Sequence, residues 1–283
     1  MPRTILITGC SSGIGQALAR ELHRRGETVI ATARRRDDLA ELAAAGLQVH
    51  ALDVTLADSR DRLMTWLDAQ GLAVDVLVNN AGYGAMGPLL DMPDERLRHQ
   101  FDANVFGLLA MTQALVPAMA ARGRGLVVNV GSVSGVLVTP FSGAYCATKA
   151  AVHALSDALR LELAPFNVQV MVVQPGAIAS EFGANASREV HAWLPDDSLY
   201  APVRDAIAAR ANASQQHATP ASEFVAAMAD ALLAEHPPAY VRIGSGSTLL
   251  PFLRYGLPRR LLDRILRRRF RLDQPLPVSP SSR

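Results

Sequence analysis

Lysine and cysteine are both scarce in this chain. The scarcity of lysine indicates a chemical role for the one that is present, and the scarcity of cysteine indicates a reducing compartment. The 283 residues include 28 lysines and arginines, of which Lys149 is the single lysine. A compact ammonium is not equivalent to a rigid guanidinium, so a chain that otherwise uses arginine is expected to have a chemical reason for this lysine. The two cysteines, Cys10 and Cys146, do not suggest a disulfide framework. We therefore expect a protein of the reducing cytoplasm.

Long apolar runs and metal-ligand clusters are missing as well. No apolar stretch reaches the roughly 18 residues of a membrane span, and a strand is predicted almost at once, so we expect neither a transmembrane helix nor a signal peptide. The seven histidines are scattered, and no spacing of ligand residues suggests a metal site. With 49% hydrophobic and 19% charged residues, the chain can bury a full core, which we expect to form one domain.

Positive charge gathers near the C-terminus. The net charge of +2 argues against a nucleic-acid-binding surface over the whole molecule, but eight arginines lie between Arg254 and Arg271 beside a single acid, Asp263. Residues 258–272 alternate apolar and arginine faces, which predicts a basic amphipathic helix. Two interpretations stay open: its apolar face packs on the substrate pocket or another subunit, or the helix docks reversibly on an anionic membrane.

The residues best suited to chemistry lie on a predicted strand, loop and helix between positions 126 and 163. Leu126–Val130 is a β-branched run bounded by glycines, which predicts a buried parallel strand with Ser132 at its carboxyl end. The helix that follows brings Tyr145 and Lys149 onto one face, one turn apart. This arrangement is typical of a proton-transfer device, and a solvated pair on a helix surface is the alternative.

The pair makes a prediction about the pKa of Tyr145. A neighbouring cation favours the phenolate, so Lys149 is expected to lower this pKa. Lowering it by about three units requires roughly 4 kcal/mol, which is plausible in a partly dehydrated site with more than one positive neighbour. A cationic nicotinamide ring would be a natural second neighbour.

A glycine-rich turn, Thr-Gly-x3-Gly-x-Gly, joins the first predicted strand, Thr4–Thr8, to an amphipathic helix. Glycines let backbone amides approach a pyrophosphate, and the N-terminus of a helix supplies free N–H groups and a positive dipole end. The spacing differs from the GxGxxG dinucleotide pattern, and a plain tight turn is the alternative.

Arginines stand where the second strand, Thr28–Thr32, is predicted to end. An acidic side chain at this point would accept from the 2′-hydroxyl of NAD and repel the 2′-phosphate of NADP. The chain has Ala33, Arg34, Arg35 and Arg36 instead, and guanidinium groups bind phosphate through paired hydrogen bonds. The sequence therefore favours NADP(H) over NAD(H), with an arginine-rich surface helix as the alternative.

Strands and helices alternate with short loops, which predicts a parallel sheet. Asp53 is predicted to end the third strand, where its carboxylate is expected either to bind an adenine amine or to be solvated. Asn79–Gly82, which includes small residues, is predicted to end the fourth strand. A helix over residues 93–121, continuous or with one break, carries Asn104 on its apolar side, as a structural amide or as part of a polar network near Tyr145. A long irregular segment, about 177–218, is expected to bind substrate.

In these residues the chain resembles the short-chain dehydrogenase/reductase family, specifically its single-domain branch with a Tyr-x3-Lys pair. The resemblance covers roughly residues 3–245. It rests, in chain order, on Thr8, Gly9, Gly13, Gly15, Asp53, Asn79 to Gly82, Asn104, Ser132, Tyr145, Lys149, Pro175 and Gly176. It implies a doubly wound, Rossmann-type α/β fold with a seven-stranded parallel sheet in the order 3-2-1-4-5-6-7 and NAD(P) at the switch point.

The resemblance also implies roles for single residues. Tyr145 is expected to be the acid in reduction and the base in oxidation, Ser132 to polarise the substrate oxygen, and Lys149 to bind the nicotinamide ribose. Asn104 is expected to hold a water that links Lys149 to solvent, and Ser180 keeps a hydroxyl where many relatives have threonine. The residues expected to bind the cofactor are Gly9, Ser11, Ser12, Gly13, Ile14, Gly15, Arg34, Arg35, Asp53, Val54, Asn80, Ala81, Gly82, Tyr145, Lys149, Pro175, Gly176, Ile178 and Ser180.

We therefore expect residues 1–245 to form a dinucleotide-binding and catalytic domain and residues 246–283 a basic extension. The expected activity is hydride transfer between NADP(H) and the carbonyl or alcohol carbon of a bulky apolar substrate, as in the retinol dehydrogenases, 17β-hydroxysteroid dehydrogenases and bacterial NADP-dependent aldehyde reductases that this branch contains. The expected pocket walls are Tyr83, Met86, Leu89, Val136, Leu137, Phe141, Phe182 and Trp193.

Two other functions stay open, a 3-oxoacyl-carrier-protein reductase and a dinucleotide-binding regulator without turnover. The family resemblance implies a homodimer or homotetramer. The C-terminal helix adds the option of a peripheral contact with the inner face of a membrane.

Overall fold

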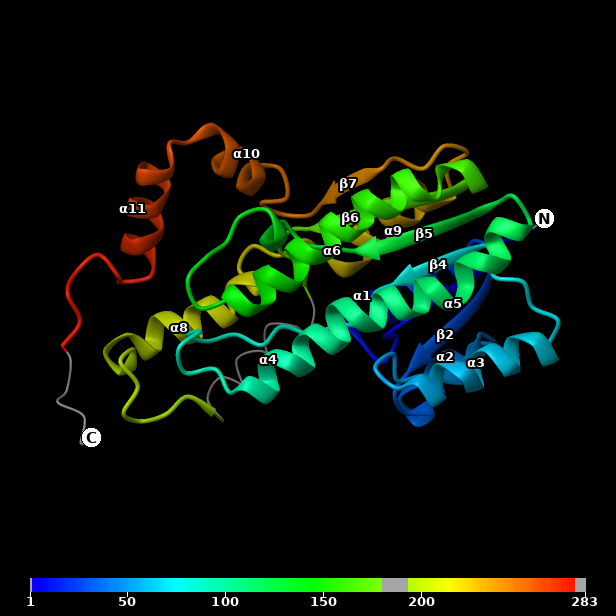
Figure 1. Ribbon diagram of the computed structural model, residues 1–283, viewed down its shortest axis with the longest axis horizontal. Coiled ribbons are helices and arrows are strands. Elements are labelled where there is room, and N and C mark those ends of the chain that lie inside the picture. Colours follow the sequence, from blue (N-terminus) through cyan, green and yellow to red (C-terminus); the bar gives the residue numbers. More distant parts are fainter. Residues whose placement is uncertain (1, 180–192, 278–283) are drawn as a thin grey trace.

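A single parallel sheet forms the centre of the molecule. In the computed structural model, which describes residues 2–179 and 193–277, seven strands lie in the order β3-β2-β1-β4-β5-β6-β7 (Figure 1), so the predicted order is confirmed. All neighbouring strands are parallel. Their bounds are β1 (Thr4–Ile7), β2 (Thr28–Ala33), β3 (Gln48–Ala51), β4 (Val76–Asn79), β5 (Gly125–Val130), β6 (Val168–Pro175) and β7 (Tyr240–Ile243).

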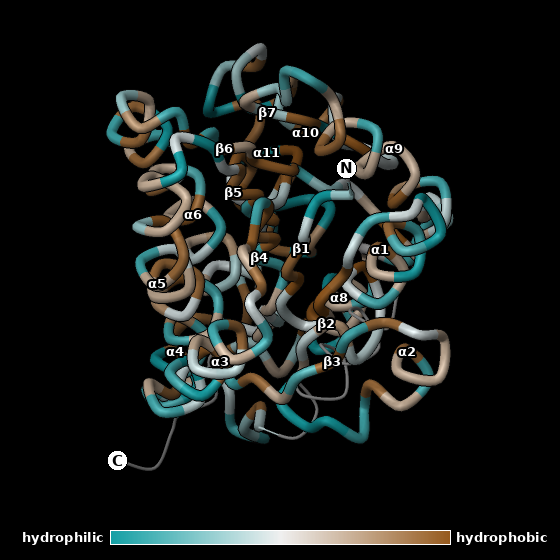
Figure 2. The backbone as a smooth tube through the Cα atoms, turned by 90° about the vertical axis from the view of Figure 1, so that its right-hand side faces the viewer, coloured by the Kyte–Doolittle hydropathy of each residue, from teal (hydrophilic) through white to brown (hydrophobic). Residues whose placement is uncertain are grey.

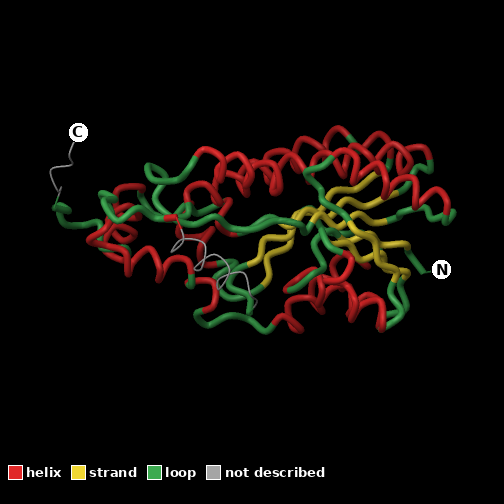
Figure 3. Tube along the Cα trace, turned by 90° about the horizontal axis from the view of Figure 1, so that it is seen from below, coloured by secondary structure: helices red, strands yellow, loops and turns green. Residues whose placement is uncertain are grey.

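Helices cover both faces of the sheet, which Figure 3 shows as a yellow layer between two red ones. One face carries α1 (Gly13–Arg24), α2 (Ala40–Ala44) and α9 (Ala221–Leu233). The other carries α3 (Ala57–Ala69), α5 (Gly107–Ala121) and α6 (Gly143–Glu162). Because successive side chains of a strand point to opposite faces, Ile5 and Ile7 of β1 belong to the first core and Leu6 to the second.

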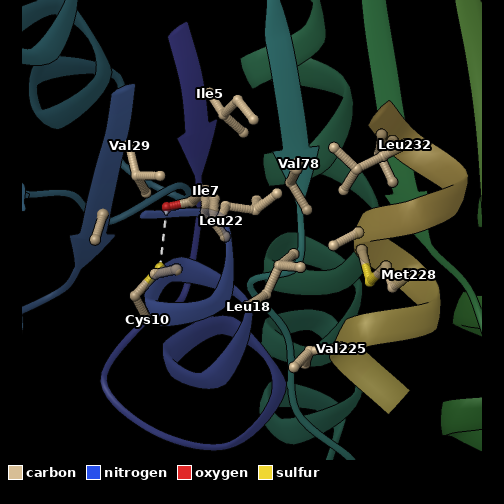
Figure 4. Close-up of a cluster of buried hydrophobic side chains, with 14 of the residues drawn as sticks. Ile5, Ile7, Cys10, Leu18, Leu22, Val29, Val78, Val225, Met228 and Leu232 are labelled. Carbon is tan, nitrogen blue, oxygen red and sulfur yellow. Dashed lines mark hydrogen bonds between the residues drawn. The ribbon is translucent and has the colours of Figure 1, made fainter. Parts of the chain in front are cut away.

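The strands are buried on both faces, which explains their nearly continuous apolar sequences. Figure 2 shows them as mostly brown, hydrophobic segments inside the molecule. In Figure 4, Leu18 and Leu22 of α1 and Met228 of α9 lie around Ile7 and Val78 of the central strands. This packing fixes the carboxyl ends of β1, β4, β5 and β6 relative to one another, which positions the site described below.

The helical stretch Asp94–Ala121 runs without a break through α4 (Asp94–Phe101), a π-helical turn η2 (Asp102–Phe106) and α5. By length and composition alone this stretch could cross a membrane. However, α5 packs Met111, Leu115 and Met119 into the core on one face of the sheet.

Three helical regions differ from the sequence predictions. The segment after β6, predicted to be irregular, contains η5 (Ala201–Val203), α8 (Arg204–Ala211) and η6 (Ala213–Gln215) in its described part. The predicted C-terminal helix is α11 (Arg259–Arg269), and an unpredicted helix α10 (Leu249–Gly256) precedes it. The helix after β2 begins as a 3-10 turn, η1 (Arg36–Leu39). Both α8 and α11 lie beyond the carboxyl ends of the strands, at the left of Figure 1.

Candidate active site

A cleft of about 1370 Å³ runs along the carboxyl ends of the strands. It collects most of the residues that the sequence singled out: Gly9, Ser11, Ser12, Gly13, Ile14, Arg34, Asp53, Val54, Asn80, Ala81, Gly82, Ser132, Tyr145, Lys149, Pro175, Gly176 and Ile178. Gly15, Arg35 and Asn104 do not line it, and Ser180 lies outside the described residues. Residues at the carboxyl ends of β1 to β6, together with residues of α1 and α6, thus meet in one elongated site.

The glycine turn after β1 brings backbone close to backbone. Gly9 and Gly13 have φ values of +75° and +58°, which disfavour residues with a Cβ. A Cβ on Gly9 would lie 2.8 Å from the Cα of Ala81, and one on Gly15 would lie 2.2 Å from the carbonyl oxygen of Gly9. Since Ser12 makes no side-chain cap, the first N–H groups of α1 are left for an anion at this end of the cleft.

Thr8 and Asn80 lock this turn to the end of β4. The backbone N–H groups of Asn80 and Ala81 both donate to Thr8 Oγ1 at 3.0 Å. In return, Asn80 Nδ2 donates to the carbonyl oxygens of Thr8 and Gly9, each at 2.9 Å. The floor of the cleft is therefore held by side-chain bonds between two strands rather than by loops alone.

The end of β2 offers a cation to the cleft. Arg34 lines it and is exposed, whereas the guanidinium of Arg35 lies 3.7 Å from Asp38 on the surface. Asp53 also lines the cleft, and its Oδ1 accepts from the backbone N–H and hydroxyl of Thr55 at 2.9 and 2.7 Å. Of the two predicted arginines, Arg34 lines the cleft and Arg35 does not.

Ser132, Tyr145 and Lys149 meet at the ends of β5 and α6. The Ser132 side chain is hydrogen-bonded to Tyr145 and also accepts from the backbone N–H of Ser134 at 3.1 Å. Lys149 Nζ donates to the carbonyl oxygen of Val130 at 2.7 Å and lies 5.8 Å from the centre of the Tyr145 ring. All three side chains are buried, and all three line the cleft.

Burial dominates the electrostatics of this group. It raises the pKa of Tyr145 to about 12, and the hydrogen bond from Ser132 and the charge of Arg210 oppose this only in part. Burial also lowers the pKa of Lys149 to about 8, because an ammonium is poorly solvated there. The net shift is upward, opposite to the lowering that the Tyr145 and Lys149 pair predicted, because burial outweighs the groups that favour the phenolate. The protein therefore keeps Tyr145 as a neutral phenol, a proton donor.

Asn104 lies in the π-helical turn, behind the cleft. Its Oδ1 accepts from the backbone N–H of Tyr83 at 3.0 Å, and its Nδ2 donates to the carbonyl oxygen of Tyr83 at 2.9 Å and to Thr148 Oγ1 at 3.1 Å. A Cβ on Gly82 would lie 2.8 Å from this Oδ1 and 4.0 Å from Lys149 Nζ. Asn104 thus ties the loop after β4 to α6, as the structural interpretation expected, and its water-holding role stays a prediction.

His153 is a residue of the site that the sequence analysis missed. The backbone N–H of Ser132 donates to His153 Nε2 at 3.4 Å, and Gly131 and Gly135 leave room for the ring, because a Cβ on either would lie within 2.6 Å of it. Burial first, and the charge of Lys149 second, lower the pKa of His153 to about 4, so the imidazole is neutral and can accept. The spacing of Tyr145, Lys149 and His153, four residues each, was the available signal.

The far end of the cleft has walls that only partly match the prediction. Tyr83, Met86 and Leu137 line it; Leu89, Val136, Phe141 and Trp193 do not, and Phe182 lies outside the described residues. Phe141 instead packs edge-on against Tyr200 and Phe270. The missing wall comes from α10, α11 and the residue that follows each of them: Leu250, Leu253, Leu257, Leu262, Ile265, Leu266 and Phe270.

The far end of the cleft includes the apolar face of α11 and two arginines. The apolar face of α11 packs on the pocket, the first of the two interpretations that its sequence left open. In addition, the buried Arg210 of α8 and the exposed Arg269 of α11 line the cleft, although none of the expected wall residues is charged.

A nicotinamide dinucleotide fits the residues at the near end. The positive N-terminus of α1 suits a pyrophosphate, Arg34 suits a ribose phosphate, and the small residues Ala81 and Gly82 allow close approach of a flat ring. Lys149 lies next to Gly82, and Tyr145 belongs to the apolar cluster that includes Leu266 and Phe270 at the far end. The order along the cleft is therefore phosphate site, proton-transfer residues, apolar pocket.

Comparisons with known proteins agree with this geometry. The family model described as short chain dehydrogenase matches residues 3–191. The chain is 34% identical over 281 residues to the short-chain dehydrogenase cctT of Talaromyces islandicus, covering 97% of each chain. It is 36% identical over 218 residues to the NADPH-dependent 1-acyldihydroxyacetone phosphate reductase of Schizosaccharomyces pombe, covering 76% of this chain and 73% of the relative.

Solved structures give the same result. A short-chain dehydrogenase from Streptomyces avermitilis superposes with a TM-score of 0.75 at 33% identity, covering 94% of each chain. A serine dehydrogenase in complex with NADP+ superposes with a TM-score of 0.75 at 26% identity, covering 87% of this chain and 96% of the other.

Proposed function

We propose that this chain, which belongs to the short-chain dehydrogenase/reductase family, transfers hydride between NADP(H) and the carbonyl or alcohol carbon of a bulky apolar substrate. The observation that carries the proposal is the order of groups along one cleft, with Ser132, Tyr145 and Lys149 between a phosphate site and an apolar pocket. The chain is an oxidoreductase by family; its cofactor preference and its substrate class are what we propose.

The bound nicotinamide would supply or accept the hydride, and the protein would handle the proton. In reduction, Ser132 and Tyr145 would hydrogen-bond the substrate oxygen, and the Tyr145 hydroxyl would give up its proton as charge develops there. Lys149 would stabilise the resulting phenolate and bind the ribose. His153 and Val130 would hold the Ser132 backbone and the Lys149 ammonium in place, through the contacts already described.

Two observations support NADP(H) as the preferred cofactor. Arg34 lines the cleft at the end of β2, and no ion pair with an acid engages it within residues 2–179 and 193–277. One relative is named as NADPH-dependent and one structural neighbour contains NADP+. A bulky apolar substrate is supported by the leucines of α10 and α11, and by the acyl group in the name of the same relative's substrate.

The test is oxidation of NADPH and NADH, followed by absorbance, with aldehydes and ketones of increasing chain length. We expect turnover with NADPH that rises with chain length. Turnover confined to acyl-carrier-protein thioesters would favour the 3-oxoacyl reductase, and tight NADPH binding without turnover of any carbonyl would favour the non-catalytic regulator.

A further inference from the structure

Arg210 is a buried cation in the wall of the cleft. It is 8% exposed, lies in α8, and lines the same cleft as Tyr145. Its Nε donates to Thr139 Oγ1 at 2.7 Å, which fixes the guanidinium while leaving its other nitrogens for a further partner. Its neighbours on α8, Ala206, Ile207 and Ala211, belong to the apolar cluster that also contains Tyr145.

The charge of Arg210 has no acid to balance it in the part of the chain that the structure describes. No ion pair joins it to a carboxylate there. Burial lowers the pKa of Arg210, and the ionisable groups close enough to act on it are Cys146, Tyr145 and a second cation, Arg269. A charge taken out of water is costly unless an opposite charge meets it, so this guanidinium is suited to a ligand that brings one.

Arg269 and the apolar wall lie at the same end of the cleft. Arg269 is the last residue of α11, is exposed, and lines the cleft together with Leu266 of the same helix and Phe270, which follows it. One buried and one exposed guanidinium are thus combined with leucine side chains. That combination suits a molecule with a charged head and an apolar chain, because guanidinium groups bind carboxylates and phosphates through paired hydrogen bonds.

We infer that Arg210, assisted by Arg269 at the rim, binds an anionic group of the substrate, a carboxylate or a phosphate. The substrate is then an anionic amphiphile, with its carbonyl at Ser132 and Tyr145 and its apolar chain along α10 and α11. This inference rests on the proposed function for its assignment to a substrate. The binding of an anion at Arg210 can be measured without any turnover.

The binding test uses the protein saturated with NADP+ and three ten-carbon probes: decanoate, decyl phosphate and neutral decanamide. Isothermal titration should find decanoate or decyl phosphate at least about tenfold tighter than decanamide, as expected for a charge-assisted contact. Arg210→Gln should abolish this preference, Arg210→Lys should keep part of it, and Arg269→Gln should weaken it less. The matched control is Arg268→Gln, which removes an exposed charge of α11 that does not line the cleft and should change nothing.

The two anionic probes show which group Arg210 binds. A preference for decyl phosphate alone indicates a phosphate on the substrate, and a preference for decanoate indicates a carboxylate. Equal affinity of the wild type for all three probes would overturn the inference, whether or not any variant folds. An equal loss of anion binding in Arg210→Gln and Arg268→Gln would also overturn the inference, because it would show that the anions respond to the net charge of the protein and not to a contact with Arg210.

The turnover test uses 4-oxodecanoate and its methyl ester with NADPH. Arg210→Gln should raise KM for the acid about tenfold and leave KM for the ester nearly unchanged. An equal fall in kcat for both, with a shifted pH profile, would instead show that Arg210 acts through Tyr145, and the inference would fail. No turnover of any carbonyl, with the anion preference intact, would defeat the proposed function and leave the anion site standing.

Discussion

At the scale of single residues, His153 sets the position of the Ser132 backbone. It is the acceptor for the Ser132 N–H, and it can accept because its ring is neutral. We predict that His153→Leu lowers kcat and stability, since it leaves a buried N–H without its acceptor, at a cost of about 1–3 kcal/mol. His153→Gln keeps an acceptor and should recover part of both, whereas equal damage in the two variants would point to lost packing.

The same residue makes stability depend on pH. The pKa of His153 is lowered from 6.5 to about 4, so between these values the unfolded chain binds a proton that the folded chain does not. The stabilisation is complete above pH 6.5 and is lost as the pH falls through 4, by about 3 kcal/mol in all. The charged groups that act on the pKa of His153, namely Lys149, Asp157 and Arg242, are unchanged in the variant. Chemical denaturation of wild type and His153→Gln should show a smaller acid-induced loss in the variant; parallel curves would contradict the assignment.

Arg34 is the residue on which cofactor choice should depend. We predict that Arg34→Ala weakens NADPH binding about tenfold or more and NADH binding little, because a charge-assisted phosphate contact is lost. Arg35→Ala is the matched control, since Arg35 does not line the cleft and should change neither affinity much. Fluorescence titration measures both cofactors, and an equal loss for both in Arg34→Ala would indicate a folding defect.

Sequence reasoning finds residues whose spacing carries chemistry and misses those whose role depends on packing. Ser132, Tyr145, Lys149 and the glycine turn belong to the first kind. Arg210 belongs to the second, because it is one arginine among many in an alanine-rich segment, and only the fold buries it beside Tyr145.

At the scale of elements, α11 completes the substrate pocket. Leu262 is buried and lines the cleft, whereas the adjacent Leu261 is 41% exposed and does not. We predict that Leu262→Ala lowers kcat/KM for long-chain aldehydes severalfold more than for short ones, since each buried methylene contributes about 0.8 kcal/mol. Leu261→Ala should leave the chain-length dependence unchanged. Rates along an aldehyde series measure this, and equal slopes for wild type and Leu262→Ala would remove α11 from the pocket.

The two helices that were not predicted, α8 and α10, lack the regular spacing of apolar residues that indicates a helix. In α8 the sequence from Arg204 to Ala211 has four alanines and one isoleucine, so no apolar stripe marks it as a helix. In α10, Pro251 and Gly256 argue against a helix, but a proline in the first turn lacks only a hydrogen bond that is not made there. By contrast, the strands are β-branched runs bounded by turn residues. The bounds predicted for β1, β2 and β5 agree with the structure to within one residue.

At the scale of the whole molecule, the outer surface of α10 is a candidate contact with a membrane. Leu249, Phe252 and Tyr255 are 57%, 67% and 77% exposed, next to the arginines of α11. The apolar face of α11 packs on the pocket, so a membrane contact would use this surface of α10 and the exposed arginines of α11 instead. We predict that the protein co-sediments with anionic vesicles at low salt and is released at high salt, because surface attraction is screened beyond about 10 Å at 0.1 M. The double variant Phe252→Ser, Tyr255→Ser should bind less, and absence of binding at low salt would rule the contact out.

The family resemblance predicts the order of the strands in the sheet, but it does not predict where the C-terminal helices pack. Periodicity identifies which face of α11 is apolar, yet nothing in the sequence says what that face covers. The structure answers through contacts, since Phe270 packs on Phe141 and the leucines of α11 line the cleft.

The central claim is that Ser132, Tyr145 and Lys149 carry out proton transfer beside a hydride-donating nicotinamide. The most direct measurement supplies NADPH labelled with deuterium at the transferred C4 position and a long-chain aldehyde, and follows the label by mass spectrometry. We predict one deuterium on the carbinol carbon of the product with the wild type, and a loss of transfer of about 10²-fold or more in Tyr145→Phe, whose cofactor affinity should be unchanged. Consumption of NADPH without label in the alcohol, or transfer at an undiminished rate by Tyr145→Phe, would contradict the account.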